Sequence, residues 1–212
     1  MKNQKVNLPT NGIGKFTNVV SDELCEKLRN YHTENIDQAC DKKHDDVENT
    51  ICKELYILEG PLHVEIQKCL IDLAQRYAKK YPYFRCFGDT GYQLRKLTGN
   101  TRRHVDGCPF IVGSELFFIN VSVILGLNDD FGEGTFYLPT QDYKTTIKKG
   151  EAVCFPVGHA FEHYTDTPIG DRYSIQTWFH EGVFNYHPSV HPSGTIQPRL
   201  MDSVDPRWTH DS

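Results

Sequence analysis

Two features that often reveal a protein's setting are missing from this 212-residue sequence. No apolar run approaches the roughly eighteen residues of a membrane span, and the first twenty residues, MKNQKVNLPTNGIGKFTNVV, lack the apolar stretch of a signal peptide. A basic excess is also missing, since the net charge is −5 and nucleic-acid binders usually carry a basic stripe. We therefore expect a cytoplasmic protein with neither a membrane nor a nucleic acid as its partner.

Paired cysteines are missing as well. The seven cysteines are odd in number, scattered, and never arranged as C-x-x-C. This pattern favours reduced thiols in a cytosol over a disulfide framework or a zinc knuckle. The seven are Cys25, Cys40, Cys52, Cys69, Cys86, Cys108 and Cys154.

The N-terminal part, residues 1–88, is predicted to be mainly helical. A short strand is expected at 14–20, followed by a helix of about four turns that begins after Ser21, a residue suited to an N-cap. The polar segment 37–50 is predicted to be a loop. A second helix is expected from about Pro61 to before Pro82, with one apolar face directed at the core.

Residues 89–181 change character and predict a β-rich core. Runs such as GYQLRKL, ELFFINVSVILGL, GTFYLP, EAVCFP and RYSIQTWF alternate with turn signals, which is typical of a sandwich or barrel. The order of two helices before the strands predicts an α+β protein in which the helices brace a sheet. Beyond 181 the chain is polar and contains prolines, so 182–212 is predicted to be an irregular C-terminal tail.

The stretch TRRHVDG places a histidine and a carboxylate two residues apart. In an extended chain, residues i and i+2 share a face, so His104 and Asp106 can point at the same spot. Alone the pair is weak, because a second copy, His44 and Asp46, lies in the charged loop and is expected to be solvated. Whether the His104/Asp106 pair is functional has to be judged from residues further along the chain.

A single histidine, His163, follows Asp106 by fifty-seven positions, and Arg172 follows His163 by nine, at the start of a β-prone run. The turn TPIGD between them predicts that they lie on adjacent antiparallel stretches. Two histidines and one carboxylate form the facial set of a non-haem Fe(II) oxygenase, which leaves room for a chelating 2-oxo acid and O2. A buried arginine suits the far carboxylate of 2-oxoglutarate, because its fork matches a carboxylate bidentately.

From about Gly91 to Phe179 the chain resembles the 2-oxoglutarate/Fe(II)-dependent dioxygenase superfamily, in its prolyl 4-hydroxylase-like branch. The motifs that carry the resemblance are RRHVDG, VSVILGLNDDFGEGTFYLP, IKKGEAVCFP and HYTDTPIGDRYSIQTWF. The resemblance implies one dioxygenase domain over 1–181 with a double-stranded β-helix (jelly-roll or cupin-like) core. It also implies that His104, Asp106 and His163 bind iron, that Arg172 binds the 2-oxoglutarate C5 carboxylate, and that ascorbate serves as reductant.

The chain departs from this family at several positions. Leu97 stands nearest to a tyrosine that often helps to hold 2-oxoglutarate, and Tyr92 and Gln93 are the candidate substitutes. Gly126 stands where another inward tyrosine is common, and an arginine of the substrate site is replaced near Ile119. His159 competes with His163 as distal ligand, but the nine-residue spacing to the arginine favours His163. His180, His187 and His191 are predicted to be surface histidines.

Three functional hypotheses follow. The first is a hydroxylase of prolyl residues in a peptide or protein, with release of succinate and CO2. The second is the same chemistry on a free amino acid, another side chain or a small metabolite, and the third is a non-catalytic β-barrel binding module. A peptide groove would draw on Phe110, Phe117, Tyr137 or Trp178, each of which could equally belong to the core. The sequence makes no prediction of oligomeric state.

Overall fold

The computed structural model describes residues 11–42, 52–107, 110–112, 115–185 and 199–200. Its main sheet is antiparallel throughout and has the strand order β1-β11-β7-β14-β5-β3-β2, with β15 and β4 pairing with β14, and β6 with β7. These strands are β1 (Gly14–Phe16), β2 (Cys40–Lys42), β3 (Cys52–Ile57), β4 (Gly88–Asp89), β5 (Tyr92–Leu97), β6 (Phe110–Val112), β7 (Glu115–Gly126), β11 (Ala152–Pro156), β14 (Arg172–Asn185) and β15 (Arg199–Leu200).

Two smaller sheets complete the β structure. One has the order β10-β9-β12 and the other pairs β13 with β8. Their strands are β8 (Gly132–Glu133), β9 (Phe136–Leu138), β10 (Tyr143–Thr145), β12 (Tyr164–Thr165) and β13 (Pro168–Ile169), and two short 3-10 helices, η1 (Ile36–Gln38) and η2 (Pro139–Gln141), lie between elements.

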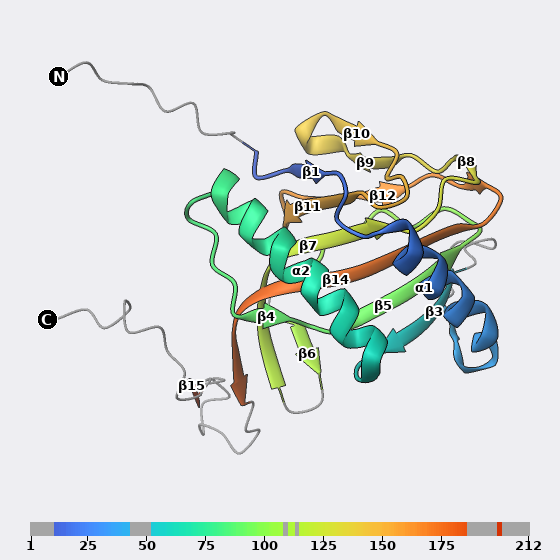
Figure 1. Ribbon diagram of the computed structural model, residues 1–212. Coiled ribbons are helices and arrows are strands. Elements are labelled where there is room, and N and C mark those ends of the chain that lie inside the picture. The colour runs from blue at the N-terminus through green and yellow to red at the C-terminus, as the bar shows by residue number, and fades with distance from the viewer. Residues whose placement is uncertain (1–10, 43–51, 108–109, 113–114, 186–198, 201–212) are drawn as a thin grey trace, which may run out of the picture.

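The two α-helices, α1 (Asp22–Glu34) and α2 (Gly60–Lys80), cover one face of the main sheet (Figure 1). Helix α1 begins where the sequence predicts, because the Ser21 side chain accepts a hydrogen bond from the Leu24 N–H at 3.2 Å. Helix α2 turns Ile66, Leu70 and Leu73 into the core. The expected α+β organisation, with helices bracing a sheet, is confirmed.

Alternation along the strands separates the two faces of the main sheet. On β14, Tyr173, Ile175 and Phe179 join the helices in the larger hydrophobic cluster. Ser174, Gln176 and Trp178 alternate with them and point to the opposite face. There, Ile124 of β7 and Phe155 of β11 pack in a second cluster with Phe136 and Leu138 of the small sheet. The site described below lies on this second face.

Three expectations about the elements need correction. Strand β3 was not expected, and part of the predicted loop 37–50 is in fact ordered as η1 and β2. Strand β14 continues to Asn185, so the chain does not become irregular at 182. The pair His44 and Asp46 and the histidines His187 and His191 lie outside the described residues.

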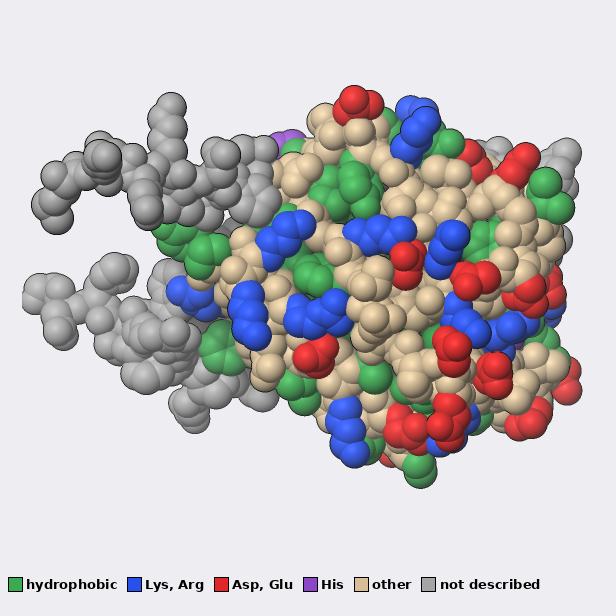
Figure 2. Space-filling view, turned by 45° about the horizontal axis from the view of Figure 1, so that its top comes forward, with side chains coloured by type: hydrophobic (Ala, Val, Ile, Leu, Met, Phe, Trp, Pro, Cys, Tyr) green, Lys and Arg blue, Asp and Glu red, His purple; other side chains and the backbone are tan. Residues whose placement is uncertain are grey.

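Among the described residues, no helix is long and apolar enough to cross a membrane. On the face seen in Figure 2, which takes in the helices and the upper side of Figure 1, Lys and Arg are interspersed with Asp and Glu around small apolar patches. Histidine side chains are almost absent from this face.

Candidate metal and carboxylate site

Three side chains that could bind a metal come together beside the second cluster. One possible ligand atom from each of His104, Asp106 and His163 lies within 4.8 Å of the others. The Nε2 atoms of His104 and His163 lie 3.7 and 3.8 Å from the two Asp106 carboxylate oxygens. The residues that the sequence singled out for this role are therefore neighbours in space.

Backbone pairing sets the spacing of the two histidines. His104 and His163 form an antiparallel bridge in which each N–H donates to the other's carbonyl, at 3.1 and 2.8 Å. Each Nδ1 lies near a backbone carbonyl, that of Arg102 at 2.8 Å and that of Phe161 at 3.0 Å. Because a carbonyl can only accept, each Nδ1 carries the proton and each Nε2 offers a lone pair to a metal.

Two donors on neighbouring strands fix the Asp106 carboxylate. Ser122 Oγ and Trp178 Nε1 both donate to Asp106 Oδ2, the tryptophan at 2.9 Å. Ser122 on β7 and Trp178 on β14 are cross-strand partners, so the pairing of the sheet brings them together. Oδ2 is thereby held by the protein, and Oδ1 is left to face a metal.

The surroundings of His163 keep its imidazole neutral. The residue is buried, and its ring meets the ring of Phe155 edge-on at 4.8 Å. Burial lowers the pKa of His163, and this outweighs the opposing effect of the Asp106 carboxylate. A neutral imidazole is the form that binds a metal.

Arg172 opens β14 on the same face as Trp178. Its side chain is buried, and its Nε and Nη2 atoms have no hydrogen-bond partner among the described residues. Burial, followed by the nearby charge of Arg95, lowers the pKa of Arg172 to about 10, so the group is still charged at neutral pH. A buried guanidinium with unused donors is suited to an anionic ligand, because leaving it unpaired is costly.

The two candidate substitutes for the family tyrosine lie on opposite faces of β5. Tyr92 is wrong as a cosubstrate residue: it is fully buried in the helix-side cluster, stacks near His63 and donates to Asp89 at 3.2 Å. Gln93 pairs with Gln176 of β14 and so shares the face of Arg172, where its role stays a prediction. Neighbouring residues of a strand point to opposite faces, so only one of Tyr92 and Gln93 can face the candidate site.

Steric crowding explains why position 126 carries glycine and not a tyrosine. A Cβ atom at this position would lie 2.3 Å from the Lys148 carbonyl oxygen and 2.8 Å from that of Ile147. The backbone of 147–148 therefore occupies the space that an inward side chain would need.

Three further expectations concern the histidines and the placement of Arg172. His163, and not the exposed His159, completes the ligand cluster. The expectation that His163 and Arg172 lie on adjacent antiparallel stretches is wrong, because His163 pairs with His104 whereas Arg172 pairs with Leu97 of β5. His180 is not a surface histidine but is buried beside Gly88.

The candidate groove aromatics stand on four strands, β6, β7, β9 and β14. Phe110 and Phe117 are cross-strand partners in β6 and β7. Tyr137 stacks on Tyr164 with ring centroids 4.7 Å apart, and Trp178 is buried and holds Asp106. The structure thus places Trp178 in contact with a candidate metal ligand, which the sequence did not indicate.

The sequence also did not indicate a buried polar group on the same face. Arg95 of β5 contacts Glu54 of β3 and Gln176 of β14. Glu54 is only 4% exposed, so it is a carboxylate held inside the protein. The signal was faint, because Glu54 lies in the strand that the sequence did not predict.

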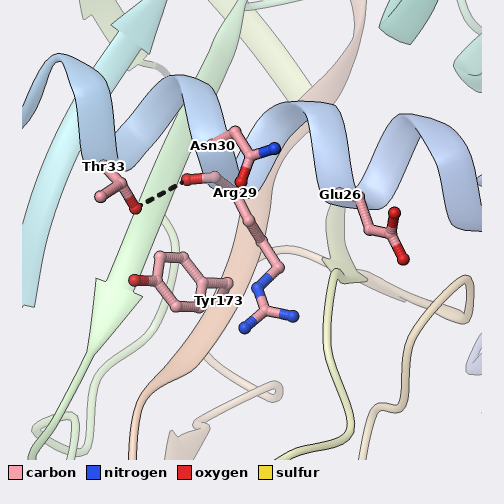
Figure 3. Close-up of a pocket in the computed structure, with 5 residues that line it drawn as sticks. All are labelled: Glu26, Arg29, Asn30, Thr33 and Tyr173. Carbon is pink, nitrogen blue, oxygen red and sulfur yellow. Dashed lines mark hydrogen bonds between the residues drawn. The ribbon is translucent and has the colours of Figure 1, made fainter.

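A separate surface pocket lies on the helix side. It is lined by Glu26, Arg29, Asn30, Thr33 and Tyr173, with Arg29 extending over the tyrosine ring (Figure 3). Tyr173 and Arg172 alternate on β14, so this pocket opens on the face opposite to the ligand cluster.

Fold and site together define a class: an antiparallel β protein braced by two helices, with a His/Asp/His cluster and a buried arginine on one face of its main sheet. No protein-family model and no curated protein matches the sequence.

Solved structures do share the fold. A viral collagen prolyl hydroxylase from Paramecium Bursaria Chlorella virus-1, in a 2OG complex, is 15% identical with a TM-score of 0.59, over 82% of this chain and 98% of that one. A Pseudomonas putida prolyl-4-hydroxylase is 15% identical with a TM-score of 0.59, over 82% and 94%. A Trichoplax adhaerens prolyl hydroxylase, in complex with a hypoxia inducible factor peptide fragment, is 17% identical with a TM-score of 0.60, over 82% and 86%. The chain has the fold of the prolyl hydroxylases.

Proposed function

We propose that this protein is an Fe(II)- and 2-oxoglutarate-dependent dioxygenase that hydroxylates a C–H bond, with peptidyl proline as substrate. The observation that carries the proposal is the pairing of two features on one face: the His104/Asp106/His163 cluster, and the buried Arg172 with unused donors. A metal-binding barrel without catalysis would need the first feature but not the second.

The residues present fit both groups. Two imidazole nitrogens and one carboxylate oxygen suit Fe(II) and leave coordination positions for a bidentate 2-oxo acid and dioxygen. Bound iron would supply oxygen activation, in which one oxygen atom enters the substrate C–H bond and the other enters succinate as CO2 is released. Ascorbate would keep the metal reduced.

The chain's own residues have distinct tasks in this proposal. Ser122 and Trp178 hold Asp106 in one orientation. Phe155 and Phe136 pack around His163 and keep water from that side. Arg172 would bind the far carboxylate of 2-oxoglutarate through the donors that the protein leaves unused.

A double-stranded β-helix is the finer description that we propose for the core. The second face of the main sheet packs against β9 through the smaller hydrophobic cluster, which is how two facing sheets share one interior. The likeness to three prolyl hydroxylases over 82% of the chain supports this architecture.

The choice of a proline-containing peptide is supported by the solved neighbours, one of which holds a peptide fragment. The test is mass spectrometry of a proline-containing peptide library after incubation with protein, Fe(II), 2-oxoglutarate and ascorbate. We expect an added oxygen on proline. Succinate formation that only a free amino acid or metabolite stimulates would transfer the proposal to a small-molecule substrate.

The metal assignment has its own test. Alanine at His104, Asp106 or His163 should abolish Fe(II) binding and turnover, because each removes one of three ligands. The exposed His159 provides the matched control, and His159→Ala should bind Fe(II) as the wild type does. Retained binding in His163→Ala, measured by equilibrium dialysis of a folded variant, would contradict the assignment.

A further inference from the structure

A second arginine lies on the face of Arg172. The register pairs Glu54 of β3 with Arg95 of β5, and Arg95 with Ser174 of β14. Ser174 lies two positions from Arg172, and cross-strand partners share a face. Arg95 and Arg172 therefore start from adjacent strands and point to the same side of the sheet.

The two arginines differ in how they are bonded. Arg95 Nε lies 3.1 Å from Glu54 Oε1 and 3.4 Å from Cys52 Sγ, and Arg95 Nη1 donates to Gln176 Oε1. Arg172, by contrast, keeps two buried donors without partners among the described residues. One guanidinium is thus fixed in place by the protein, and the other is available to a ligand.

The fixed guanidinium is close enough to Arg172 to affect it electrostatically. After burial, the charge of Arg95 is the next cause of the lowered pKa of Arg172. A second positive charge therefore lies near the arginine that has unused donors.

The Glu54–Arg95 ion pair has no net charge, but its two charged groups start at different distances from β14. Neighbouring strands lie about 4.8 Å apart, so Glu54 starts two strands away from β14 and Arg95 starts one strand away. The positive end of the pair is therefore nearer to Arg172 than the negative end.

We propose that Arg95, held by Glu54 and Gln176, is a specificity-determining residue whose charge favours 2-oxo acids with a second carboxylate over those without one. It acts through space on the ligand's far carboxylate, while Arg172 makes the contact. The inference rests on the proposed function and concerns which cosubstrates the same site selects.

The test compares two ligands of equal chain length on protein loaded with Mn(II). 2-Oxoglutarate carries the second carboxylate, and 2-oxopentanoate lacks it. Titration calorimetry of each ligand gives the ratio of their dissociation constants. Damage to the fold or to the metal site weakens both ligands, whereas a loss of selectivity changes the ratio.

Two variants should change this ratio in opposite directions. The double variant Glu54→Gln/Arg95→Gln removes the pair without leaving a buried charge alone, and the preference for 2-oxoglutarate should fall on the order of tenfold. Glu54→Gln alone removes the compensating anion and keeps the cation, so the preference should rise. If the pair acted only by positioning Arg172, the preference for 2-oxoglutarate would instead fall in both variants.

Lys96→Gln is the matched control, because Lys96 is the next residue on β5, points to the other face and pairs with Asp171 at 2.7 Å. Its ratio should equal that of the wild type. An unchanged ratio in the double variant, or a fall in Glu54→Gln, would overturn the inference, and the single variant decides if the double variant does not fold. Wild-type protein that binds no 2-oxoglutarate with Mn(II) would instead contradict the proposed function.

Discussion

The hydrogen bond from Trp178 to Asp106 Oδ2, at 2.9 Å, is the contact whose loss can be tested most cleanly. Trp178→Phe keeps an aromatic ring in the buried position but removes the N–H donor. Partners of metal ligands typically contribute 10- to 100-fold to metal affinity, and we expect a loss of about that size. Equilibrium dialysis with Fe(II) or Mn(II) measures it, and an unchanged affinity would show that Ser122 alone suffices to hold the carboxylate.

Arg172 allows cosubstrate binding to be separated from metal binding. Arg172→Ala should leave metal affinity unchanged and weaken 2-oxoglutarate binding by roughly 2–5 kcal/mol, because a buried carboxylate would lose its charged partner. Calorimetry on the Mn(II)-loaded variant gives both values. Wild-type affinity for 2-oxoglutarate in a folded Arg172→Ala protein would rule out the contact.

The residues of the ligand cluster could be predicted because their information is local. His104 and Asp106 are two positions apart, and His163 and Arg172 are nine apart, and these spacings in this order resemble the pattern of the dioxygenase superfamily. Ser122 and Trp178 could not be assigned in this way. Their meeting depends on the register of β7 against β14, and neither residue type distinguishes a core role from a role beside a metal.

At the scale of the elements, helix α1 is tied to the sheet by a buried histidine. His32 Nε2 lies 3.1 Å from the Lys53 carbonyl oxygen, and its ring meets Tyr173 edge-on at 5.6 Å. Burial lowers the pKa of His32 below its ordinary value of about 6.5. The helix therefore packs on the sheet with the imidazole neutral.

This burial predicts how stability depends on pH. Below about pH 6.5 the unfolded chain takes up a proton that the folded protein resists, so stability falls as the pH falls. His32→Gln removes this contribution and should lose less stability between about pH 6.5 and 5, measured by urea unfolding. The exposed His159 is the control, because His159→Gln should follow the wild type. Parallel curves for wild type and His32→Gln would contradict the prediction.

The helices and long strands followed from periodicity, whereas β3 and the two faces of β5 did not. Strand β3 has a charged residue, Glu54, at a buried position, and its partner β5 lies beyond α2 in the chain. Strand β5 carries polar groups on both faces, so alternation could not tell Tyr92 from Gln93. The pairing of β3 with β5, and of β5 with β14, determines both the presence of β3 and the faces of β5. A single sequence contains little information about such long-range pairing.

For the whole molecule, the candidate metal site lies beside the hydrophobic interior and does not form it. The larger cluster joins both helices to the main sheet, and the smaller one joins the main sheet to β9. None of the three candidate ligands is a member of either cluster, although the His163 ring packs against Phe155 and Phe136 of the smaller one. The fold should therefore persist when the metal is removed.

Chelation of the metal tests this. Protein treated with EDTA should still unfold cooperatively in urea. Adding 2-oxoglutarate at a hundred times its dissociation constant to Mn(II)-loaded protein should then raise the free energy of unfolding by about 2.7 kcal/mol. His163→Ala should show the first behaviour but not the second. Loss of cooperative unfolding on chelation would mean that the metal is part of the core.

Strand β14 has a consequence for how this chain can change over evolutionary time. Arg172, Gln176 and Trp178 stand on one face of it, while Tyr173, Ile175 and Phe179 fill the core on the other. Deleting or inserting one residue between 172 and 178 would exchange the faces beyond that point and turn either the arginine or the tryptophan toward the helices. A substitution in this strand alters one side chain at a time, whereas a change of length preserves the two faces only in steps of two.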